Sequence, residues 1–375
     1  MGRLENDIET LKAHAAYRTL RLPHGRDFSS NDYLGLAQHP KLVAATIAAV
    51  QDNGMVGAGG SRLLRGHHPA HEKLEEHAAR FFGSEAALFF GGGFLANFAL
   101  FTTLPERHDA VIFDEHIHAS VKEGIHAGTA KRFRAAHNDL NSFEDNIKRA
   151  RESGARDVWI AVESVYSMDG DVAPLSQLYA LARAHNATLI VDEAHATGVF
   201  GASGRGLSEG LLSENVISVH TCGKALGVYG ALVCSGKTTR DYLINKARPF
   251  IYATAPPPHL ASGVSCALDL VEAEPWRRTR LAELSAFAAH ELKDIAGGRL
   301  REGGTQILPF ILGEGGEAVR IAALLQAEGF DVRAIRPPTV PEGTARLRIS
   351  LNININENDI AALAQALATA LEKTA

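Results

Sequence analysis

Short apolar segments alternate with helical stretches between about residues 41 and 250. The clearest of them are Ala86–Phe90, Ala110–Phe113, Val158–Val162, Ala187–Val191, Val216–His220 and Ala231–Cys234. Alternation on this scale predicts a mostly parallel sheet covered by helices on both faces. We therefore expect an α/β protein whose chemistry lies in the loops at the carboxyl ends of the strands.

The remaining segments predict three domains in all. Residues 1–40 form an N-terminal helix (4–22) and arm, residues 41–255 the large α/β domain, and residues 256–375 a linking helix (260–296) and a small α+β domain. In the small domain we expect strands at 307–312, 331–335 and 346–351 and helices at 317–328 and 357–372. Residues 352–356 alternate in polarity and predict the end of a half-buried strand.

Composition excludes several classes of function. The net charge of −5 gives no basic field for nucleic acid. No apolar run approaches the roughly 18 residues that a membrane span needs, and the polar N-terminus argues against a signal peptide. The three cysteines lack Cys-x-x-Cys spacing, which disfavours a disulfide framework or a thiolate zinc site. We expect a soluble cytoplasmic protein.

A carboxylate, an imidazole and an amine follow two neighbouring predicted strands. Asp192 and His195 come after the strand at 187–191, and Lys224 after the strand at 216–220. Parallel strands bring such residues to one crevice. An amine that can form a Schiff base and an acid that can pair with a pyridinium nitrogen are what pyridoxal phosphate (PLP) requires of a protein. Taken singly, a lysine such as Lys224 is more often a surface residue, and an acid such as Asp192 is more often a helix cap.

A glycine cluster follows the strand at 86–90. Gly91-Gly92-Gly93-Phe94 opens a predicted helix, whose first N–H groups can bind a phosphate. The alternative is a simple glycine-rich turn. The dinucleotide spacing G-x-G-x-x-G is missing, and no glycine cluster ends in Gly-Lys-Ser/Thr, so a P-loop is disfavoured.

Other candidates follow further strands. His118 can stack on a planar cofactor, and with His116 it resembles a metal-binding pair, but such a pair needs a third ligand and a fourth position, and we expect no metal. Glu163 follows the strand at 158–162. In Arg346-Leu347-Arg348, one guanidinium can face the cleft and grip a substrate carboxylate while its neighbour faces away. A surface charge is the alternative for either arginine.

These motifs resemble those of the α-oxoamine synthases, PLP enzymes of aminotransferase fold type I. The resemblance runs from about Asp27 to Leu351 and rests on Phe28–Leu36, Gly57–Arg62, Ser167–Asp171, Asp192-Glu193-Ala194-His195 and Thr221-Cys222-Gly223-Lys224. It implies a mostly parallel seven-stranded sheet in the large domain and a smaller α+β C-terminal domain. The segment Arg336–Arg348 is most similar to the members that join L-alanine to a pimeloyl thioester.

The resemblance also implies residue roles around the cofactor. Lys224 would hold PLP covalently, Asp192 would pair with the ring nitrogen, His195 would bond the ring's 3′-oxygen, and His118 would stack on the ring. These four would form the catalytic set. The phosphate would be bound near Gly93 and Phe94 and by Thr221, with Glu163 and Ser167 lining the pocket and Thr254 contributed by the partner subunit.

For the substrates, the resemblance implies that Arg348 binds the amino-acid carboxylate. Thr339 and either Arg18 or Arg21 would also contact substrate. The implied reaction is a decarboxylative condensation in biotin synthesis by a homodimer with shared active sites. The acyl carrier, coenzyme A or acyl-carrier protein, stays open. Alternatives are a sister reaction of glycine with acetyl-CoA or succinyl-CoA, an aminotransferase, and a non-catalytic PLP-binding protein. Only Leu22–Asp27 stands where family members usually carry a longer β-rich insertion.

Overall fold

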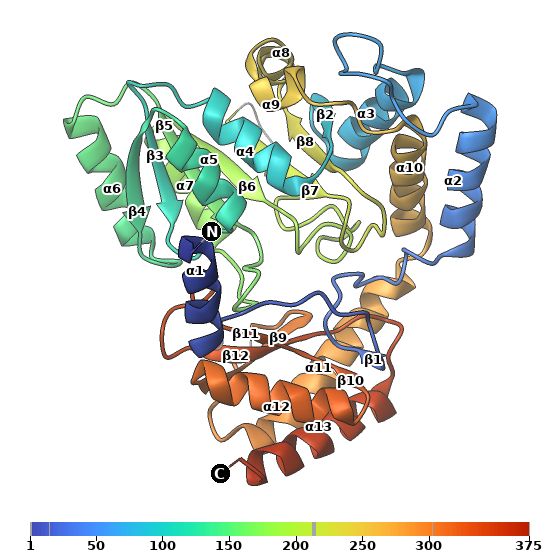
Figure 1. Ribbon diagram of the computed structural model, residues 1–375. Coiled ribbons are helices and arrows are strands. Elements are labelled where there is room, and N and C mark those ends of the chain that lie inside the picture. Colours follow the sequence, from blue (N-terminus) through green and yellow to red (C-terminus); the bar gives the residue numbers. More distant parts are fainter. Residues whose placement is uncertain (1, 15, 212–214, 302, 375) are drawn as a thin grey trace. The chain divides into compact units, whose positions relative to one another are not determined.

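The computed structural model describes residues 2–14, 16–211, 215–301 and 303–374 (Figure 1). The chain forms two compact units. The large unit comprises Leu34–Tyr166 and Val172–Arg278. The small unit comprises the chain before Leu34, the chain from Thr279 onward, and the inserted segment Ser167–Asp171. Each unit is described by itself below.

A seven-stranded sheet forms the centre of the large unit. Its strands are β2 (Ala86–Phe90), β3 (Ala110–Asp114), β4 (Lys131–Ala135), β5 (Val158–Glu163), β6 (Ala187–Asp192), β7 (Val216–Thr221) and β8 (Ala231–Ser235). They lie in the order β2-β8-β7-β6-β5-β3-β4. The run from β7 to β4 is parallel, and β8 is antiparallel to both of its neighbours. The prediction of a mostly parallel seven-stranded sheet is confirmed.

Helices cover both faces of this sheet (Figure 1). The helices of the large unit are α2 (Pro40–Asn53), α3 (Pro69–Phe82), α4 (Gly93–Thr103), α5 (Ala119–Ala127), α6 (Leu140–Glu152), α7 (Leu175–Ala184), α8 (Lys237–Lys246), α9 (Arg248–Ile251) and α10 (Pro258–Ala273). Side chains of β5 alternate between two cores. Ala161 packs in the core that contains α4 and α5, while Ile160 and Val162 pack in the core with α6 and α7. Burial on both faces explains why the strands read as continuous apolar runs.

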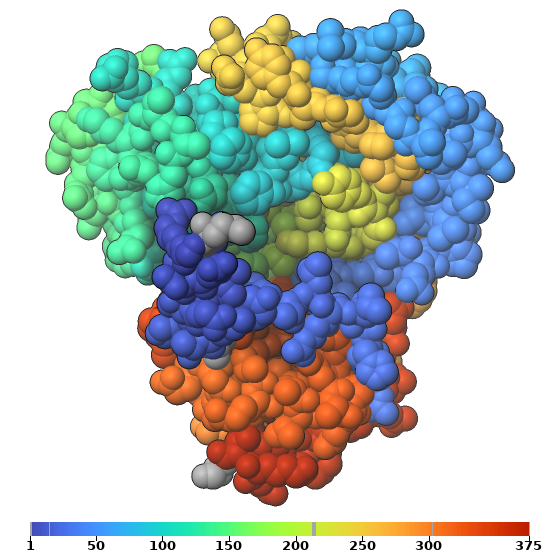
Figure 2. All heavy atoms as spheres, in the orientation of Figure 1, coloured from blue at the N-terminus to red at the C-terminus, as the bar shows by residue number. Residues whose placement is uncertain are grey.

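The small unit is an α+β structure. Its elements are α1 (Gly2–Ala13), β1 (Arg26–Asp27), most of α11 (Trp276–Ala296), β9 (Ile307–Gly313), α12 (Gly315–Ala327), β10 (Phe330–Asp331), β11 (Arg333–Ile335), β12 (Ala345–Ser350) and α13 (Glu357–Glu372). β11, β12 and β9 form an antiparallel sheet, and β1 pairs with β10. Helix α1 buries none of its residues and lies on the surface in Figure 2.

Several elements differ from the sequence prediction. The first helix ends at Ala13 instead of residue 22, and the predicted long helix at 260–296 is two helices, separated at Glu274-Pro275. A proline cannot donate the backbone hydrogen bond that would continue a helix. Residues 352–356 form a turn instead of a strand, and Asn356 at its end caps α13. The domain boundaries at 40 and 255 stay a prediction. No helix in the described ranges is long and apolar enough to cross a membrane.

Candidate active site

Asp192 is the last residue of β6 and is held by two donors. Its Oδ1 accepts from the backbone N–H of Ala194 at 2.9 Å, and its Oδ2 accepts from Nδ2 of Asn97 at 2.7 Å. The side chain is almost completely buried. Because the two donors come from different elements, the carboxylate is fixed in orientation at the carboxyl edge of the sheet.

Lys224 and His195 lie together at the same edge. Lys224 stands in the loop after β7, and its Nζ is 2.8 Å from Nε2 of His195. His195 is buried, and Lys224 is half-buried. An amine in hydrogen-bond contact with an imidazole has a proton-exchange partner, which suits a lysine that must lose its proton to act as a nucleophile.

His118 is linked to Asp192 through two buried polar side chains. It caps α5, and its Nδ1 lies 2.8 Å from Oγ of Ser120 and accepts from the Ser120 backbone N–H at 3.2 Å. Oγ of Ser120 in turn accepts from Nδ2 of Asn97 at 3.0 Å. Burial lowers the pKa of His118, the Asp192 charge opposes this, and the Lys224 charge adds to it. His118 is therefore close enough to feel both charges and favours the neutral form.

The N-terminus of α4 meets the end of β7. Helix α4 begins at Gly93 with Gly92 as N-cap, and no side chain in the described part of the chain caps it, so the N–H groups of its first turn have neither an intrahelical acceptor nor a side-chain acceptor there. A Cβ placed on Gly93 would lie 2.9 Å from Oγ1 of Thr221, the last residue of β7. Glycine at this position lets uncapped N–H groups and a hydroxyl converge, and Phe94 follows as the second helical residue.

These groups fit pyridoxal phosphate. The start of α4 and Thr221 offer neutral donors and a helix dipole to a phosphate, Asp192 offers a buried carboxylate to a ring nitrogen, and Lys224 offers an amine. Within the described residues, no group of three or more His, Cys, Asp or Glu side chains is placed to hold a metal.

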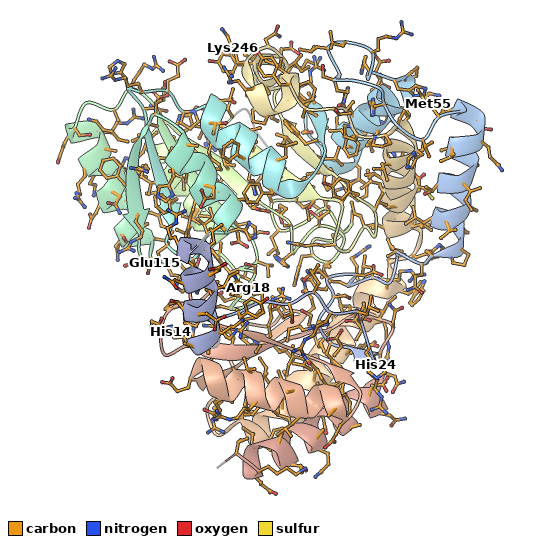
Figure 3. All side chains as sticks on the ribbon, in the orientation of Figure 1. His14, Arg18, His24, Met55, Glu115 and Lys246 are labelled. Atoms are coloured by element: carbon orange, nitrogen blue, oxygen red, sulfur yellow. The ribbon has the colours of Figure 1, made fainter. Side chains whose placement is uncertain are left out.

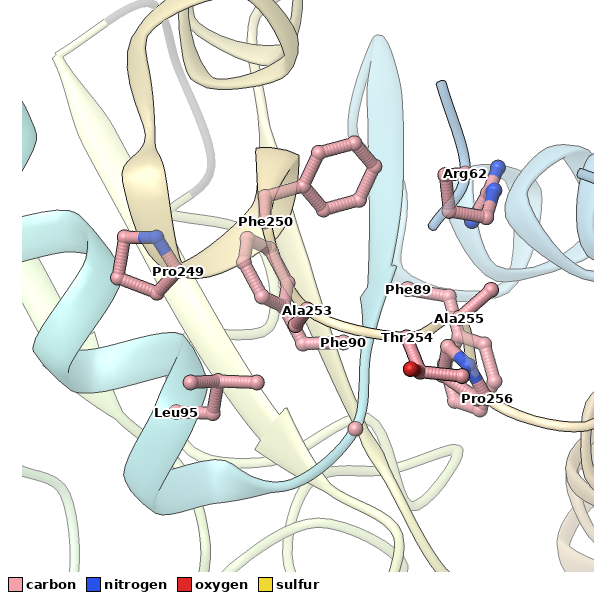
Figure 4. A pocket seen from close by; sticks show the side chains of 11 residues that line it. Arg62, Phe89, Phe90, Leu95, Pro249, Phe250, Ala253, Thr254, Ala255 and Pro256 are labelled. Carbon is pink, nitrogen blue, oxygen red and sulfur yellow. The ribbon is translucent and has the colours of Figure 1, made fainter. Parts of the chain in front are cut away.

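Two further candidates lie in the large unit. Glu163 ends β5, is buried, and pairs in register with Asp192 on the neighbouring strand. Thr254 follows α9 and is exposed, and it lines a pocket together with Gly91 and Leu95 of the same chain (Figure 4). Gly91 is the residue before the N-cap of α4, so this pocket borders the proposed phosphate cradle.

The remaining candidates belong to the small unit. Nη2 of Arg18, which Figure 3 labels, donates to Oγ1 of Thr339 at 3.2 Å, whereas Arg21 donates to Gln326. Of the two N-terminal arginines, Arg18 is thus the one that joins Thr339. The roles of these residues stay predictions.

Both arginines of the Arg346-Leu347-Arg348 motif are buried, so the alternative of a surface charge is wrong for each. They project from the same face of β12, because side chains two residues apart on a strand share a face. Arg348 donates from Nε to the carbonyl of Ser167 at 2.6 Å and from Nη2 to Oδ1 of Asn31 at 3.2 Å. Its neighbour Arg346 does not face away but pairs with Asp169 at 2.7 Å.

Known proteins share this architecture. A family model described as aminotransferase class I and II matches residues 23–367. An 8-amino-7-oxononanoate synthase from Chromobacterium violaceum is 47% identical over 328 residues, 86% of this chain and 83% of that protein.

Two solved structures resemble the chain closely. A serine palmitoyltransferase from S. paucimobilis with a bound PLP–myriocin aldimine has a TM-score of 0.90 at 27% identity, covering 99% of this chain and 97% of that chain. An 8-amino-7-oxononanoate synthase from Francisella tularensis has a TM-score of 0.80 at 29% identity, covering 93% and 98%.

The fold and the lysine site define a fold type I transferase that depends on pyridoxal phosphate, so the predicted fold class and cofactor are confirmed. The chain belongs to the 8-amino-7-oxononanoate synthases, within the aminotransferase class I and II family. It is an enzyme, and its predicted class, an acyltransferase of this family, is confirmed.

The sequence did not reveal the roles of Asn97 and Ser120. Asn97 lies in an otherwise apolar helix, and Ser120 stands two residues after His118. One feature of the sequence could have pointed to Asn97: it is an amide among apolar residues of a predicted helix, and a buried polar group needs a hydrogen-bond partner. The sequence could not say that the partners would be Asp192 and Ser120.

Proposed function

We propose that the enzyme condenses L-alanine with a pimeloyl thioester to give 8-amino-7-oxononanoate. A carbon–carbon bond forms between the alanine Cα and the acyl carbonyl carbon, the thiol carrier leaves, and the alanine carboxyl departs as CO2. The observation that carries the proposal is the meeting of Lys224, Asp192 and His118 at one sheet edge in a chain 47% identical to a relative with this product in its name.

PLP, when bound, supplies an electron sink for negative charge at the substrate Cα. Lys224 would hold the cofactor, and its free amine would take the alanine Cα proton as general base. Asp192 keeps a proton on the ring nitrogen, which its charge and fixed orientation favour. His195, which contacts Lys224, would donate to the ring's 3′-oxygen, and His118 would cover the ring.

Arg348 is our candidate for the alanine carboxylate. Its guanidinium is buried, and its hydrogen bonds go to neutral oxygens of Ser167, Asn31, Tyr33 and Ser350. No carboxylate among the described residues pairs with it. A buried cation without a counter-ion is costly, so an anionic substrate group at this side chain would be favourable.

The far carboxylate of the pimeloyl chain suits the arginines near Thr339. Arg18 donates to Thr339, and partial burial together with the Arg18 charge lowers the pKa of Arg336. Two guanidinium groups that repel each other create a positive local potential, which an acyl chain ending in a carboxylate would relieve. Ser167 and Glu163 are proposed to line the cofactor pocket.

We further propose a homodimer in which Thr254 reaches the phosphate of the partner subunit. The exposure of Thr254 supports this, because its side chain is available to a partner subunit. The thiol carrier is either coenzyme A or acyl-carrier protein.

Mass spectrometry of the products tests the reaction. Alanine, glycine and serine are each offered with pimeloyl, succinyl and acetyl thioesters of coenzyme A and with pimeloyl-acyl-carrier protein. We expect 8-amino-7-oxononanoate from alanine and a pimeloyl thioester, loss of product and of the bound-cofactor absorbance in Lys224→Ala, and neither loss in the surface variant Lys246→Ala (Figure 3). Faster turnover of glycine with acetyl-CoA or succinyl-CoA would replace the proposed reaction with a sister reaction.

A further inference from the structure

Asn97 is a buried amide on an apolar helix. It is the fifth residue of α4, is 2% exposed, and sits in the sequence Gly-Phe-Leu-Ala-Asn-Phe-Ala-Leu-Phe. Packing alone does not call for an amide here, since burying a polar group is unfavourable unless it is hydrogen-bonded. The reason for the amide must lie in its partners.

Both N–H groups of the Asn97 amide are engaged. One donates to Oδ2 of Asp192 at 2.7 Å, and the other donates to Oγ of Ser120 at 3.0 Å. The amide oxygen, by contrast, has no hydrogen-bond partner among the described residues. The donors therefore fix the amide, because a flipped amide would bring its oxygen against the Asp192 carboxylate.

The second donor determines where the Ser120 proton goes. Since the Ser120 oxygen accepts from Asn97, its own hydrogen is directed to another acceptor, and Nδ1 of His118 lies 2.8 Å away. That nitrogen also accepts from the Ser120 backbone N–H. With Nδ1 as acceptor, the proton of the neutral His118 ring sits on Nε2.

We propose that Asn97 is a positioning residue that sets both protein groups facing the cofactor ring. One amide nitrogen orients the Asp192 carboxylate directly and, by directing the Ser120 hydroxyl to Nδ1, helps to hold the His118 ring that the Ser120 backbone N–H also contacts. This inference rests on the proposed function, in which Asp192 meets the ring nitrogen and His118 the ring face. Groups held in place before the cofactor arrives lose little freedom when it binds.

Two Asn97 variants test the inference in the PLP-loaded, full-length enzyme. Asn97→Leu removes both N–H donors and keeps a side chain of similar size. Asn97→Ala removes the same donors with a smaller side chain, so that it cannot overfill the site. Ser120→Ala removes the link to His118 together with the second Asn97 hydrogen bond, and keeps the hydrogen bond from Asn97 to Asp192. Thr102→Val is the matched control, because the Thr102 hydroxyl bonds only to backbone carbonyls of its own helix.

Two readouts other than activity separate positioning from packing. Equilibrium dialysis gives the PLP dissociation constant, and 15N spectra of histidine-labelled enzyme report the His118 tautomer, with His118→Gln identifying the signal. We expect PLP binding to weaken roughly tenfold or more in both Asn97 variants, since a hydrogen bond to a charged group is lost. The 15N shift of Nδ1 of His118 should move in the Asn97 variants and in Ser120→Ala, because the contact from the Ser120 hydroxyl is disturbed or lost while the Ser120 backbone N–H remains a donor to this nitrogen. Ser120→Ala should keep PLP affinity within about threefold, and Thr102→Val should change neither readout.

Other outcomes overturn the proposal. If the Asn97 variants only melt at lower temperature while PLP affinity and the His118 signal stay unchanged, Asn97 merely joins α4 to α5. Failure of both Asn97 variants to fold would also assign the residue to the core. An unchanged His118 signal in Ser120→Ala would refute the relay. Loss of the cofactor absorbance in Lys224→Ala, measured in parallel, keeps these failures distinct from a failure of the proposed function.

Discussion

Replacing Gly93 with alanine should disturb the phosphate cradle through a single contact. The new Cβ would lie 2.9 Å from Oγ1 and 3.4 Å from Cβ of Thr221, closer than side-chain carbons normally approach other atoms. Thr221 ends a buried strand, so either its hydroxyl rotates away or the first turn of α4 moves. In both cases the phosphate loses one charge-assisted hydrogen bond. Such a bond contributes about 1.5–3 kcal/mol, which corresponds to roughly 10- to 150-fold weaker PLP binding.

Gly91→Ala provides the matched control two residues earlier. Its Cβ would meet only Cδ2 of Leu95, at an ordinary 3.8 Å, so we expect PLP affinity within about threefold of the native enzyme. Equilibrium dialysis of PLP from both variants, with melting temperatures of the cofactor-free forms, gives the comparison. Combining Gly93→Ala with Thr221→Val should cost less than the sum of the two single changes, because both act on one hydroxyl. Equal affinity for the Gly93 variant and the native enzyme, or an equal loss in Gly91→Ala, would refute the reasoning.

Four other predictions follow from the site and the core. Asp192→Asn should bind PLP more weakly and lose most exchange of the alanine Cα proton, because an amide cannot keep the ring nitrogen protonated; near-normal exchange in deuterated water would exclude the role. Arg348→Lys should raise KM for alanine far more than KM for the thioester, at a cost of roughly 1–3 kcal/mol, and an unchanged alanine KM would move the carboxylate site elsewhere. Burial lowers the pKa of His220 to about 3. Below the pKa of about 6.5 that a histidine has in an unfolded chain, only the unfolded state gains this proton, so by pH 5 the free energy of unfolding falls by ~2 kcal/mol. Urea unfolding at pH 7 and pH 5 should therefore show a smaller difference in stability for His220→Asn than for the native enzyme. If sites are shared, mixed dimers of Lys224→Ala and Thr254→Ala should exceed both parents in activity, and activity equal to the parents' average would show that each subunit builds its own site.

In the seven-stranded sheet, the sequence predicted the six strands that are buried on both faces and missed the seventh. β4, Lys131-Arg132-Phe133-Arg134-Ala135, lies at the sheet edge, and three of its residues are exposed cations. Charged edge strands are common because they resist pairing with other chains, but they carry no apolar run to recognise. The same limit explains the N-terminal arm, where residues 16–25 are without regular structure and give no periodicity that separates Arg18 from Arg21.

Residues at the ends of strands were easier to predict than the contacts between them. Asp192, His195 and Lys224 could be placed because parallel topology brings the carboxyl ends of neighbouring strands together. The Asn97–Ser120 contact depends on how α4 packs against α5, and side chains 23 positions apart in sequence give no local sign of it. Packing of one helix on another is decided by the whole core, so this part of the site needed the structure.

The two buried arginines of β12 show why burial alone does not identify a substrate contact. Arg346 pairs with Asp169, so its charge is compensated inside the protein, and it also donates to the carbonyl of Met168. Arg348, two residues later on the same face, has only neutral acceptors in the described part of the chain. The first arrangement is complete without a ligand, and the second leaves a buried charge that a substrate carboxylate would balance. Arg346→Lys therefore serves as the internal control for Arg348→Lys: it should lower the melting temperature and leave KM for alanine unchanged. If Arg346→Lys raised the KM for alanine as much as Arg348→Lys does, the absence of a charged partner at Arg348 among the described residues would not be what marks an arginine as a substrate contact.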